Sequence, residues 1–205
     1  LPSSNTDMPL VINESQEVLI LNKGDRKPLS QLENNVDNIT VGLGWNIAPN
    51  GEQVELDASV FLLNENGIVN GDHDLIYYHQ LSSSCESVCL ELYPDSGVGQ
   101  DKAKVVIDLN KLAPNICRIV VCLSIYDADT KRQSFNQVLS PYFRICNSSN
   151  DKELARFNLP ESHEEVTAMI FGEVYRHNNT WKFRAKGQGY AGGFKKMCDE
   201  YGAEY

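Results

Sequence analysis

A glycine-rich segment near the end of the chain has the composition of an anion-binding loop. Residues 187–193 read Gly-Gln-Gly-Tyr-Ala-Gly-Gly, and lysines flank them at positions 186, 195 and 196. The segment follows a predicted strand and precedes a predicted helix, so its backbone amides could surround a phosphate group. The residues predicted to bind this anion are Lys186, Gly187 and Gly189. A sharp bend from strand to helix explains the same glycines more simply, and both interpretations stay open.

A second candidate is a loop rich in Gly and Asp between Pro94 and Lys102. Calcium takes about six to eight oxygen ligands, so a calcium site needs several acids on loops that can bend. Asp95 and Asp101 lie in this loop. An EF-hand is excluded, because the 12-residue window from Asp95 ends at Val106, where a bidentate Glu is required. Without a ligand, the same acids and glycines would form solvated turns.

Cysteine spacing does not predict a zinc site. The six cysteines include Cys85-x3-Cys89 and Cys117-x4-Cys122, which match none of the paired zinc-ligand patterns. We interpret them as reduced thiols, which are typical of a cytoplasmic protein. A cytoplasmic location is therefore our expectation.

Histidine spacing and known catalytic motifs do not predict an enzyme. His73 and His79 flank a predicted strand beside Asp74, which could make a metal site or a general base, but no third partner at a fixed spacing is evident. The sequence has no G-x-S-x-G elbow, no Walker loop and no G-x-G-x-x-G between a strand and a helix. We therefore expect a protein without enzymatic activity.

Composition limits the class of partner. The 205 residues carry 18 Lys and Arg against 28 Asp and Glu, a formal net charge of -10. This balance argues against nucleic acid, because duplex binding depends on basic side chains that neutralise phosphates. The longest apolar run, residues 116–125, is interrupted by Arg118 and is too short to span a bilayer. We expect cations or basic proteins as ligands, and no direct membrane insertion.

The candidate residues are positioned by a chain whose hydrophobic residues mostly alternate. Residues 1–14 show no periodicity and are predicted to be a flexible lead-in, and residues 15–205 are predicted to form one domain. About ten short strands separated by Gly, Asn and Pro turns predict an all-β, two-sheet β-sandwich. Residues 116–126 are apolar on both faces, as in a central strand that is covered on both sides. Phe194, Met197, Cys198 and Tyr201 recur at helical spacing and predict a short C-terminal helix.

Several segments carry a resemblance to a known family. They are Lys23-Gly-Asp25, Val41-Gly-Leu-Gly-Trp45, Leu56-Asp-Ala-Ser59, Ser124-Ile-Tyr-Asp-Ala128, Gln133-x-Phe-x-Gln137, Thr167-Ala-Met-Ile-Phe-Gly-Glu173, and the long run from Trp181 to Gly193. In order and over almost the whole chain, from about Val18 to Gly202, they resemble the TerD family of tellurium-resistance and stress-response proteins. The resemblance implies a β-sandwich without a known enzymatic activity. It also implies calcium binding and a partner membrane protein from the same tellurium-resistance or stress gene cluster.

The resemblance also assigns candidate calcium ligands. The family pattern places them here at Asp57, Asp74, Asp95 and Asp101. Lys102 and Ala103 replace an Asp and a Glu of the family's acidic loop, which removes two carboxylates and adds a positive charge. Such a change weakens a divalent site, because affinity depends largely on ligand charge count. The sequence is compatible both with a chain that still binds calcium and with one that has lost calcium binding.

Two further functions remain as alternatives. Wider relatives of the family include proteins described as binding cyclic nucleotides, which would suit the glycine-rich segment at 187–193. The third possibility is a protein-protein adaptor without a metal, in which the acidic surface meets a basic patch on a partner.

Overall fold

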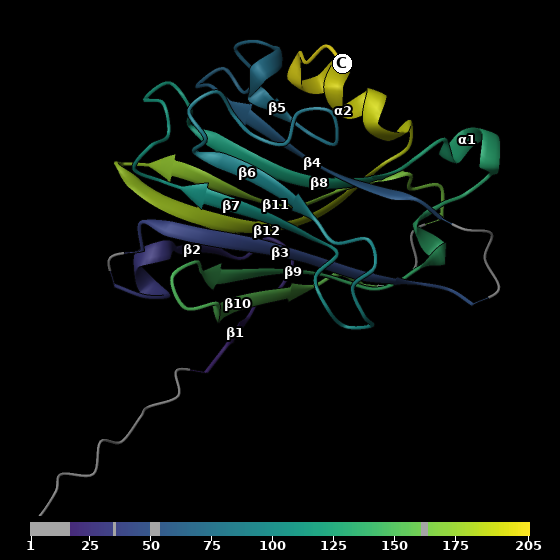
Figure 1. The fold of residues 1–205 in the computed structure, drawn as a ribbon, viewed down its shortest axis with the longest axis horizontal. Coiled ribbons are helices and arrows are strands. Elements are labelled where there is room, and N and C mark those ends of the chain that lie inside the picture. The colour runs from purple at the N-terminus through teal and green to yellow at the C-terminus, as the bar shows by residue number, and fades with distance from the viewer. Residues whose placement is uncertain (1–16, 35, 50–53, 161–163) are drawn as a thin grey trace, which may run out of the picture.

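Two six-stranded sheets pack face to face in the computed structural model, which describes residues 17–34, 36–49, 54–160 and 164–205 (Figure 1). The first sheet has the strand order β1 (Leu19–Ile20), β10 (Lys152–Asn158), β9 (Val138–Asn147), β3 (Asn38–Ile47), β7 (Ala103–Asp108), β6 (Val88–Leu92). The second has the order β2 (Arg26–Pro28), β12 (Thr180–Tyr190), β11 (Ala168–His177), β8 (Arg118–Ile125), β4 (Leu56–Leu63), β5 (Leu75–Ile76). The predicted all-β sandwich is confirmed.

The described residues form twelve strands rather than about ten. One strand that the sequence did not predict is the three-residue edge strand β2. Strand β2 reads Arg-Lys-Pro and has no hydrophobic alternation, so the sequence pattern gave no signal for it. Ile68-Val69, whose two β-branched residues follow an Asn-Gly pair and favour a return strand, lies in a loop. The predicted flexible segment 1–14 lies outside the described residues.

Strand β8 is the centre of the second sheet and is covered on both faces, as predicted. Ile119, Val121 and Leu123 face the core between the two sheets. Val120 and Cys122 face the opposite way and belong to a second, outer cluster of buried side chains. This two-sided burial explains why the segment is apolar at almost every position.

The predicted C-terminal helix covers that outer face. Helix α2 (Gly193–Tyr201) buries Met197, Cys198 and Tyr201 against the second sheet. The ring of Tyr201 lies 5.0 Å from the ring of Phe61 in β4, between their centroids. The backbone amide of Gly193 donates to Thr167 Oγ1 at 2.9 Å, which fixes the start of the helix beside strand β11.

The glycine-rich segment is mostly strand and not a loop. Strand β12 continues to Tyr190, so Gly187 and Gly189 pair with β11 or lie at its bulge. A Cβ at Gly189 would lie 2.6 Å from Val166, which explains a glycine there without a ligand. The chain bends at Gly192 and Gly193, whose φ angles are +98° and +61°. The predicted bend therefore exists, but it is shorter than the glycine run.

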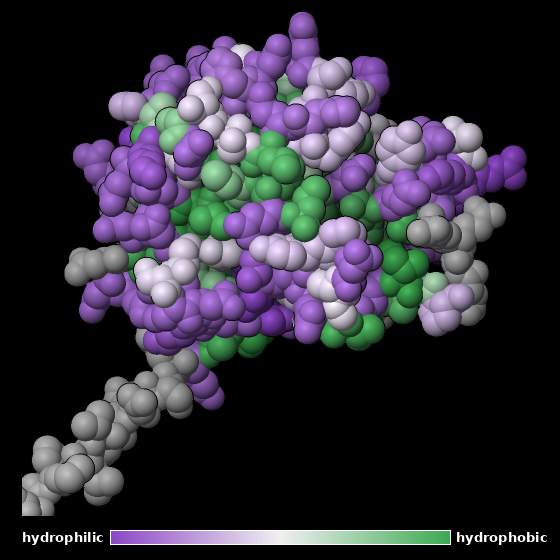
Figure 2. Space-filling view, in the orientation of Figure 1, coloured by the Kyte–Doolittle hydropathy of each residue, from purple (hydrophilic) through white to green (hydrophobic). Residues whose placement is uncertain are grey.

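The helical segments elsewhere are short. A four-residue helix α1 (Ala128–Lys131) follows β8, and single 3-10 turns occupy Leu29–Gln31, Asp72–Asp74 and Phe135–Gln137. In the described ranges we find no helix with the length and apolar character that a bilayer crossing demands. Figure 2 shows hydrophobic side chains reaching the surface in the middle of one face, with hydrophilic ones around them.

We predict that Phe61→Ala destabilises the fold by about 3–5 kcal/mol, because it removes a fully buried ring and leaves a cavity beneath α2. Urea unfolding followed by circular dichroism measures the change. Val98→Ala is the control, since Val98 is 87% exposed and its truncation should change stability by less than about 0.5 kcal/mol. Equal effects of the two variants would contradict the assigned packing.

Candidate functional site

Asp101 is held inside the protein by an ion pair. Its carboxylate accepts hydrogen bonds from Arg144 Nη2 at 2.6 Å, Arg144 Nε at 2.9 Å and the Tyr142 hydroxyl at 2.9 Å. The ammonium group of Lys104 lies 4.0 Å away. The Asp101 side chain is 3% exposed, so these partners replace the water that a free carboxylate would bind.

Two glycines of β3 make room for this ion pair. A Cβ on Gly42 would lie 2.7 Å from the Asp101 carboxylate oxygens, and a Cβ on Gly44 would lie 2.1 Å from the Tyr142 ring. The Val-Gly-Leu-Gly-Trp segment is therefore explained by close packing and not by a ligand.

The Arg144 guanidinium continues the network to strand β10. It donates to Glu153 at 3.3 Å, and Glu153 also accepts from Arg156. The hydrogen bond from Arg144 to Asp101 raises the pKa of Arg144 above its usual range. Burial, reinforced by Asp101, raises the pKa of Tyr142 in the same way. Both groups therefore keep their protons, and the network joins three strands of the first sheet.

The other predicted calcium ligands lie in separate surroundings. Asp74 is buried and accepts from the backbone amide and the side-chain amide of Asn70, at 3.1 and 2.9 Å. Asp95 is exposed in a turn, and Asp57 lies in β4 of the second sheet. Within the described ranges, no three His, Cys, Asp or Glu side chains converge on a point where they could hold a metal ion.

The loop itself is tied by a lysine. The ammonium group of Lys102 donates to the carbonyl oxygen of Ser96, within the segment that was predicted to bind calcium. Lys102 also lines a hollow of about 620 Å³ together with Asp57 and Asn46. The residues present therefore do not fit a calcium site of the kind that the resemblance implies.

Lys186 of the predicted anion site faces an internal carboxylate. Its ammonium group lies 3.8 Å from Glu173, which is 4% exposed and also has Arg118 at 3.6 Å and Arg184 at 3.8 Å. The Glu173 carboxylate therefore already pairs with Lys186, Arg118 and Arg184, so Lys186 is not free to bind an added anion. Gly187 and Gly189 lie in the adjoining strand, so the three predicted residues do not form a loop around a phosphate.

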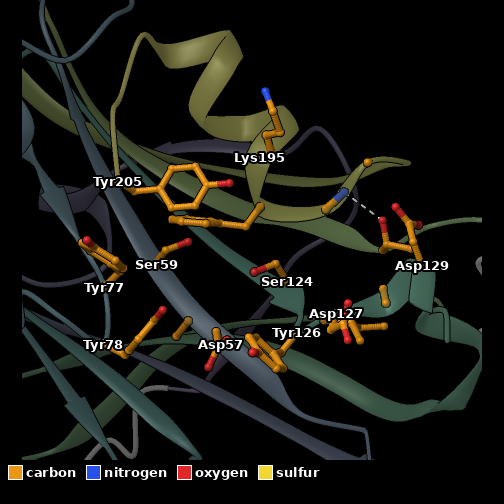
Figure 3. A pocket seen from close by; sticks show the side chains of 17 residues that line it. Asp57, Ser59, Tyr77, Tyr78, Ser124, Tyr126, Asp127, Asp129, Lys195 and Tyr205 are labelled. Atoms are coloured by element: carbon orange, nitrogen blue, oxygen red, sulfur yellow. Dashed lines mark hydrogen bonds between the residues drawn. The ribbon is translucent and has the colours of Figure 1, made fainter. Parts of the chain in front are cut away.

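A pocket of about 530 Å³ opens on the outer face of the second sheet (Figure 3). Strands β4 and β8 form its floor, α2 and the C-terminal residues form one side, and the segment 126–129 forms another. Asp57 and Ser124 are direct cross-strand neighbours on the floor. Side chains at such positions lie about 5 Å apart at Cβ, so a ligand can contact both.

The acids of this pocket differ from Asp101 and Glu173 because they have no ion-pair partner among the described residues. Asp57, Asp127 and Asp129 line the pocket, and their carboxylates make no hydrogen bond or ion pair with any residue that the structure describes. Partial burial, reinforced by the nearby charge of Glu55 and opposed by Lys131, raises the pKa of Asp57. A partly desolvated carboxylate without a partner favours the approach of a cation or a hydrogen-bond donor.

Aromatic rings form the walls of the pocket. Tyr77 stacks on Phe194 with 5.9 Å between ring centroids, and Phe194 meets the edge of Tyr205 at 4.9 Å. Tyr78 and Tyr126 are about half exposed and lie on the opposite side. Aromatic faces next to carboxylates are a common environment for organic cations.

Sequence reasoning identified Asp57 but missed most of this pocket. Ser124, Tyr126 and Asp127 stand together in the segment Ser-Ile-Tyr-Asp-Ala, which is one of the segments that resemble the family. Polar residues that directly follow a long apolar strand are a sequence feature that could have indicated a binding site at the end of that strand. The aromatic residues near the C-terminus gave none, because their position follows from how α2 packs.

Comparison with known proteins identifies the family of the chain. Residues 18–201 match the model of the TerD domain. The chain belongs to the TerD family. It is 44% identical to "Tellurium resistance protein TerD" of Serratia marcescens over 184 residues, which are 89% of this chain and 96% of that protein. It is 37% identical to "General stress protein 16U" of Bacillus subtilis (strain 168), over 90% of this chain and 97% of that protein.

Solved structures of TerD-like proteins share the fold. The crystal structure of a homologue of telluride resistance protein (TerD) from Streptomyces coelicolor A3(2) superposes with a TM-score of 0.60 at 18% identity. The alignment covers 83% of this chain and 100% of that one. A second crystal structure, of the unknown function protein SAV2460, gives a TM-score of 0.64 at 21% identity, over 83% of this chain and 99% of that one. The chain is thus a TerD-family protein of the tellurium-resistance and stress-response group.

We predict that Arg144→Ala destabilises this TerD domain by about 3–5 kcal/mol, because it leaves Asp101 buried without its main partner. Lys104→Ala is the matched control, since its ammonium group is farther from Asp101 and partly exposed, and it should cost less than about 1 kcal/mol. Chemical denaturation at pH 7 compares the two variants. A loss no larger for Arg144→Ala than for Lys104→Ala would contradict the role assigned to this ion pair.

We predict that Asp57→Asn raises the melting temperature at pH 7 and leaves it unchanged below about pH 3.9, the usual pKa of an Asp in an unfolded chain. The folded pKa of Asp57 is raised, so ionisation of this group costs stability above that pH and costs nothing below it. Calorimetry across the pH range measures the difference. Asp95→Asn, at an exposed turn, is the control that should show little pH-dependent gain. A lower melting temperature of Asp57→Asn at pH 7 would contradict the prediction.

Proposed function

We propose that this TerD-family chain is a non-enzymatic stress-response protein that binds a protein partner and does so without calcium. The observation that carries the proposal is the distribution of its acids. The carboxylates predicted to bind calcium are dispersed or internally paired. Three carboxylates without an ion-pair partner among the described residues, Asp57, Asp127 and Asp129, line the aromatic pocket above β4 and β8. This arrangement favours recognition of a partner over storage or sensing of a divalent ion.

The pocket contents also favour binding over catalysis. Its polar groups are carboxylates, the hydroxyls of tyrosine, serine and threonine, and the ammonium group of Lys195, and no histidine or cysteine of the described residues lines it. Ser59 makes a hydrogen bond to Cys122, and neither residue has a base positioned to activate it among the described residues. A nucleophile without a base and an orienting group does not support a hydrolytic mechanism.

The charge of the chain favours a basic partner. A net charge of -10 repels acidic proteins and accelerates association with basic ones. We propose that the partner is another protein of the same tellurium-resistance or stress gene cluster, and that a basic segment at the inner surface of a membrane protein is one suitable form. The TerD-family chain would then act as an adaptor in a complex at that surface.

We predict that titration of the metal-stripped chain with calcium gives no calcium-selective heat beyond that of magnesium. Lys102 and the pairing of Asp101 with Arg144 are the reasons. The charge-restored variant Lys102→Asp with Ala103→Glu is the comparison, since it returns two carboxylates to the loop. Tight, calcium-selective binding by the unmodified chain would overturn the metal-independent function.

Capture of partners tests the adaptor function directly. Immobilised chain is incubated with extract of the source cells under tellurite stress, in buffer with calcium and in buffer with a chelator. The expected result is the same basic partner in both buffers, identified by mass spectrometry. Partner capture that requires calcium would contradict the proposal.

A further inference from the structure

The pocket on the outer face of the second sheet contains a buried hydroxyl without a partner. Ser124 is 3% exposed, and its side chain makes no hydrogen bond with the residues that the structure describes. Figure 3 shows this hydroxyl pointing into the space between Tyr205 on the side of α2 and Tyr78 and Tyr126 opposite. The residue is buried while its hydroxyl opens on the pocket, so a ligand in the pocket can reach this donor and acceptor.

The carboxylates around this hydroxyl lack partners as well. Asp57 stands directly beside Ser124 on the floor, and Asp127 and Asp129 line the adjoining side. Asp127 has a left-handed backbone, φ 53°, and its side chain does not cap helix α1. Lys195 also lines the pocket, but its ammonium group is held by Asp199 at 2.8 Å. Among the described residues no side chain forms an ion pair with these three carboxylates, and Lys131 offsets only part of the effect of burial on Asp57.

The aromatic walls define the kind of cation that fits. A bare metal ion needs several oxygens at 2.0–2.6 Å and gains little from rings, and no such cluster of ligands is present in the described part of the chain. An ammonium or guanidinium group on an apolar stem gains both from the carboxylates and from the ring faces. The same chemistry occurs next to the pocket, where Lys131 lies 5.0 Å from the centroid of the Tyr126 ring.

We propose that this pocket binds an arginine or lysine side chain presented by a partner protein. This inference rests on the proposed function, because it names the feature of the partner that the pocket recognises. Asp57 and Ser124 accept the donors of the cationic head, and the rings of Tyr78 and Tyr126 pack on its stem. The volume of about 530 Å³ exceeds that of one side chain and leaves room for the neighbouring residues of an extended peptide.

The local energetics agree with such a ligand. The raised pKa of Asp57 means that its charge costs the unbound protein stability. A bound guanidinium would remove that cost by pairing with the carboxylate in a charge-assisted hydrogen bond. The unpaired groups of this pocket thus favour binding at the expense of stability, as functional sites often do.

Fluorescence anisotropy with a labelled peptide tests the proposal. The probe is a nine-residue peptide of glycine and serine with two arginines, and its control has citrulline in place of both arginines. We expect the unmodified chain to bind the arginine peptide and not the citrulline peptide. We expect Asp57→Asn with Asp127→Asn to weaken binding by about tenfold or more, through the loss of two charge-assisted contacts.

The matched control separates the pocket from the overall charge. Asp95→Asn with Glu65→Gln removes the same two charges from exposed turns outside the pocket, and it should change the affinity by less than about twofold. Equal weakening by the two double variants would overturn the proposal. Melting curves of each variant confirm that the protein remains folded.

Two further experiments distinguish a partner's side chain from a free small molecule, and distinguish failure of this inference from failure of the proposed function. Free N-acetyl-arginine amide should bind much more weakly than the peptide, and equal affinity would overturn the assignment to a partner's side chain. The capture experiment is repeated with Asp57→Asn and Asp127→Asn. Loss of the partner supports the pocket, whereas undiminished capture overturns this inference and leaves the adaptor function intact.

Discussion

The architecture depends on one constraint, the burial of strand β8 on both faces. Its inward side chains complete the core between the two sheets, and its outward side chains Val120 and Cys122 need a second cover. Helix α2 supplies that cover by placing Met197 and Tyr201 on them. Because the helix is shorter than the strand, the end of β8 at Ser124 is left beside an open space, and this space is the pocket.

The charged residues of the protein fall into two groups with different consequences. Asp101 and Glu173 are buried, Glu153 is partly buried, and all three pair with Arg or Lys side chains, so they hold strands together. The carboxylates of the pocket form no ion pair with the described residues, and Lys131 opposes only part of the pKa rise that burial gives Asp57. A buried carboxylate with a partner is structural, because breaking the pair leaves an uncompensated charge. A carboxylate without one is available for a ligand, at a cost to the unbound state.

The Gly-Asp-rich loop at residues 94–102 contains a carboxylate of the paired kind. In the Gly-Asp-rich segment, Asp101 has turned inward to Arg144, and Lys102 bonds to the carbonyl of Ser96. A loop closed by its own lysine has fewer oxygens free and less negative charge than a loop built for a divalent ion. The TerD fold thus fixes the strands of this chain, whereas the chemistry of this loop depends on its own side chains, which agrees with the general independence of fold and site.

The sequence by itself determined the fold class, the two-sided burial of β8, the C-terminal helix and the TerD family. These features depend on local periodicity and on motifs that a single chain displays. It did not determine which acids are paired. Asp101 and Arg144 are 43 residues apart, and Asp57 meets Ser124 only because β4 pairs with β8. It also predicted a glycine loop where β12 continues, since strand pairing with β11 overrides the local preference of glycine for turns. Whether a carboxylate is free to bind depends on contacts distant in sequence, and only the tertiary structure decides them.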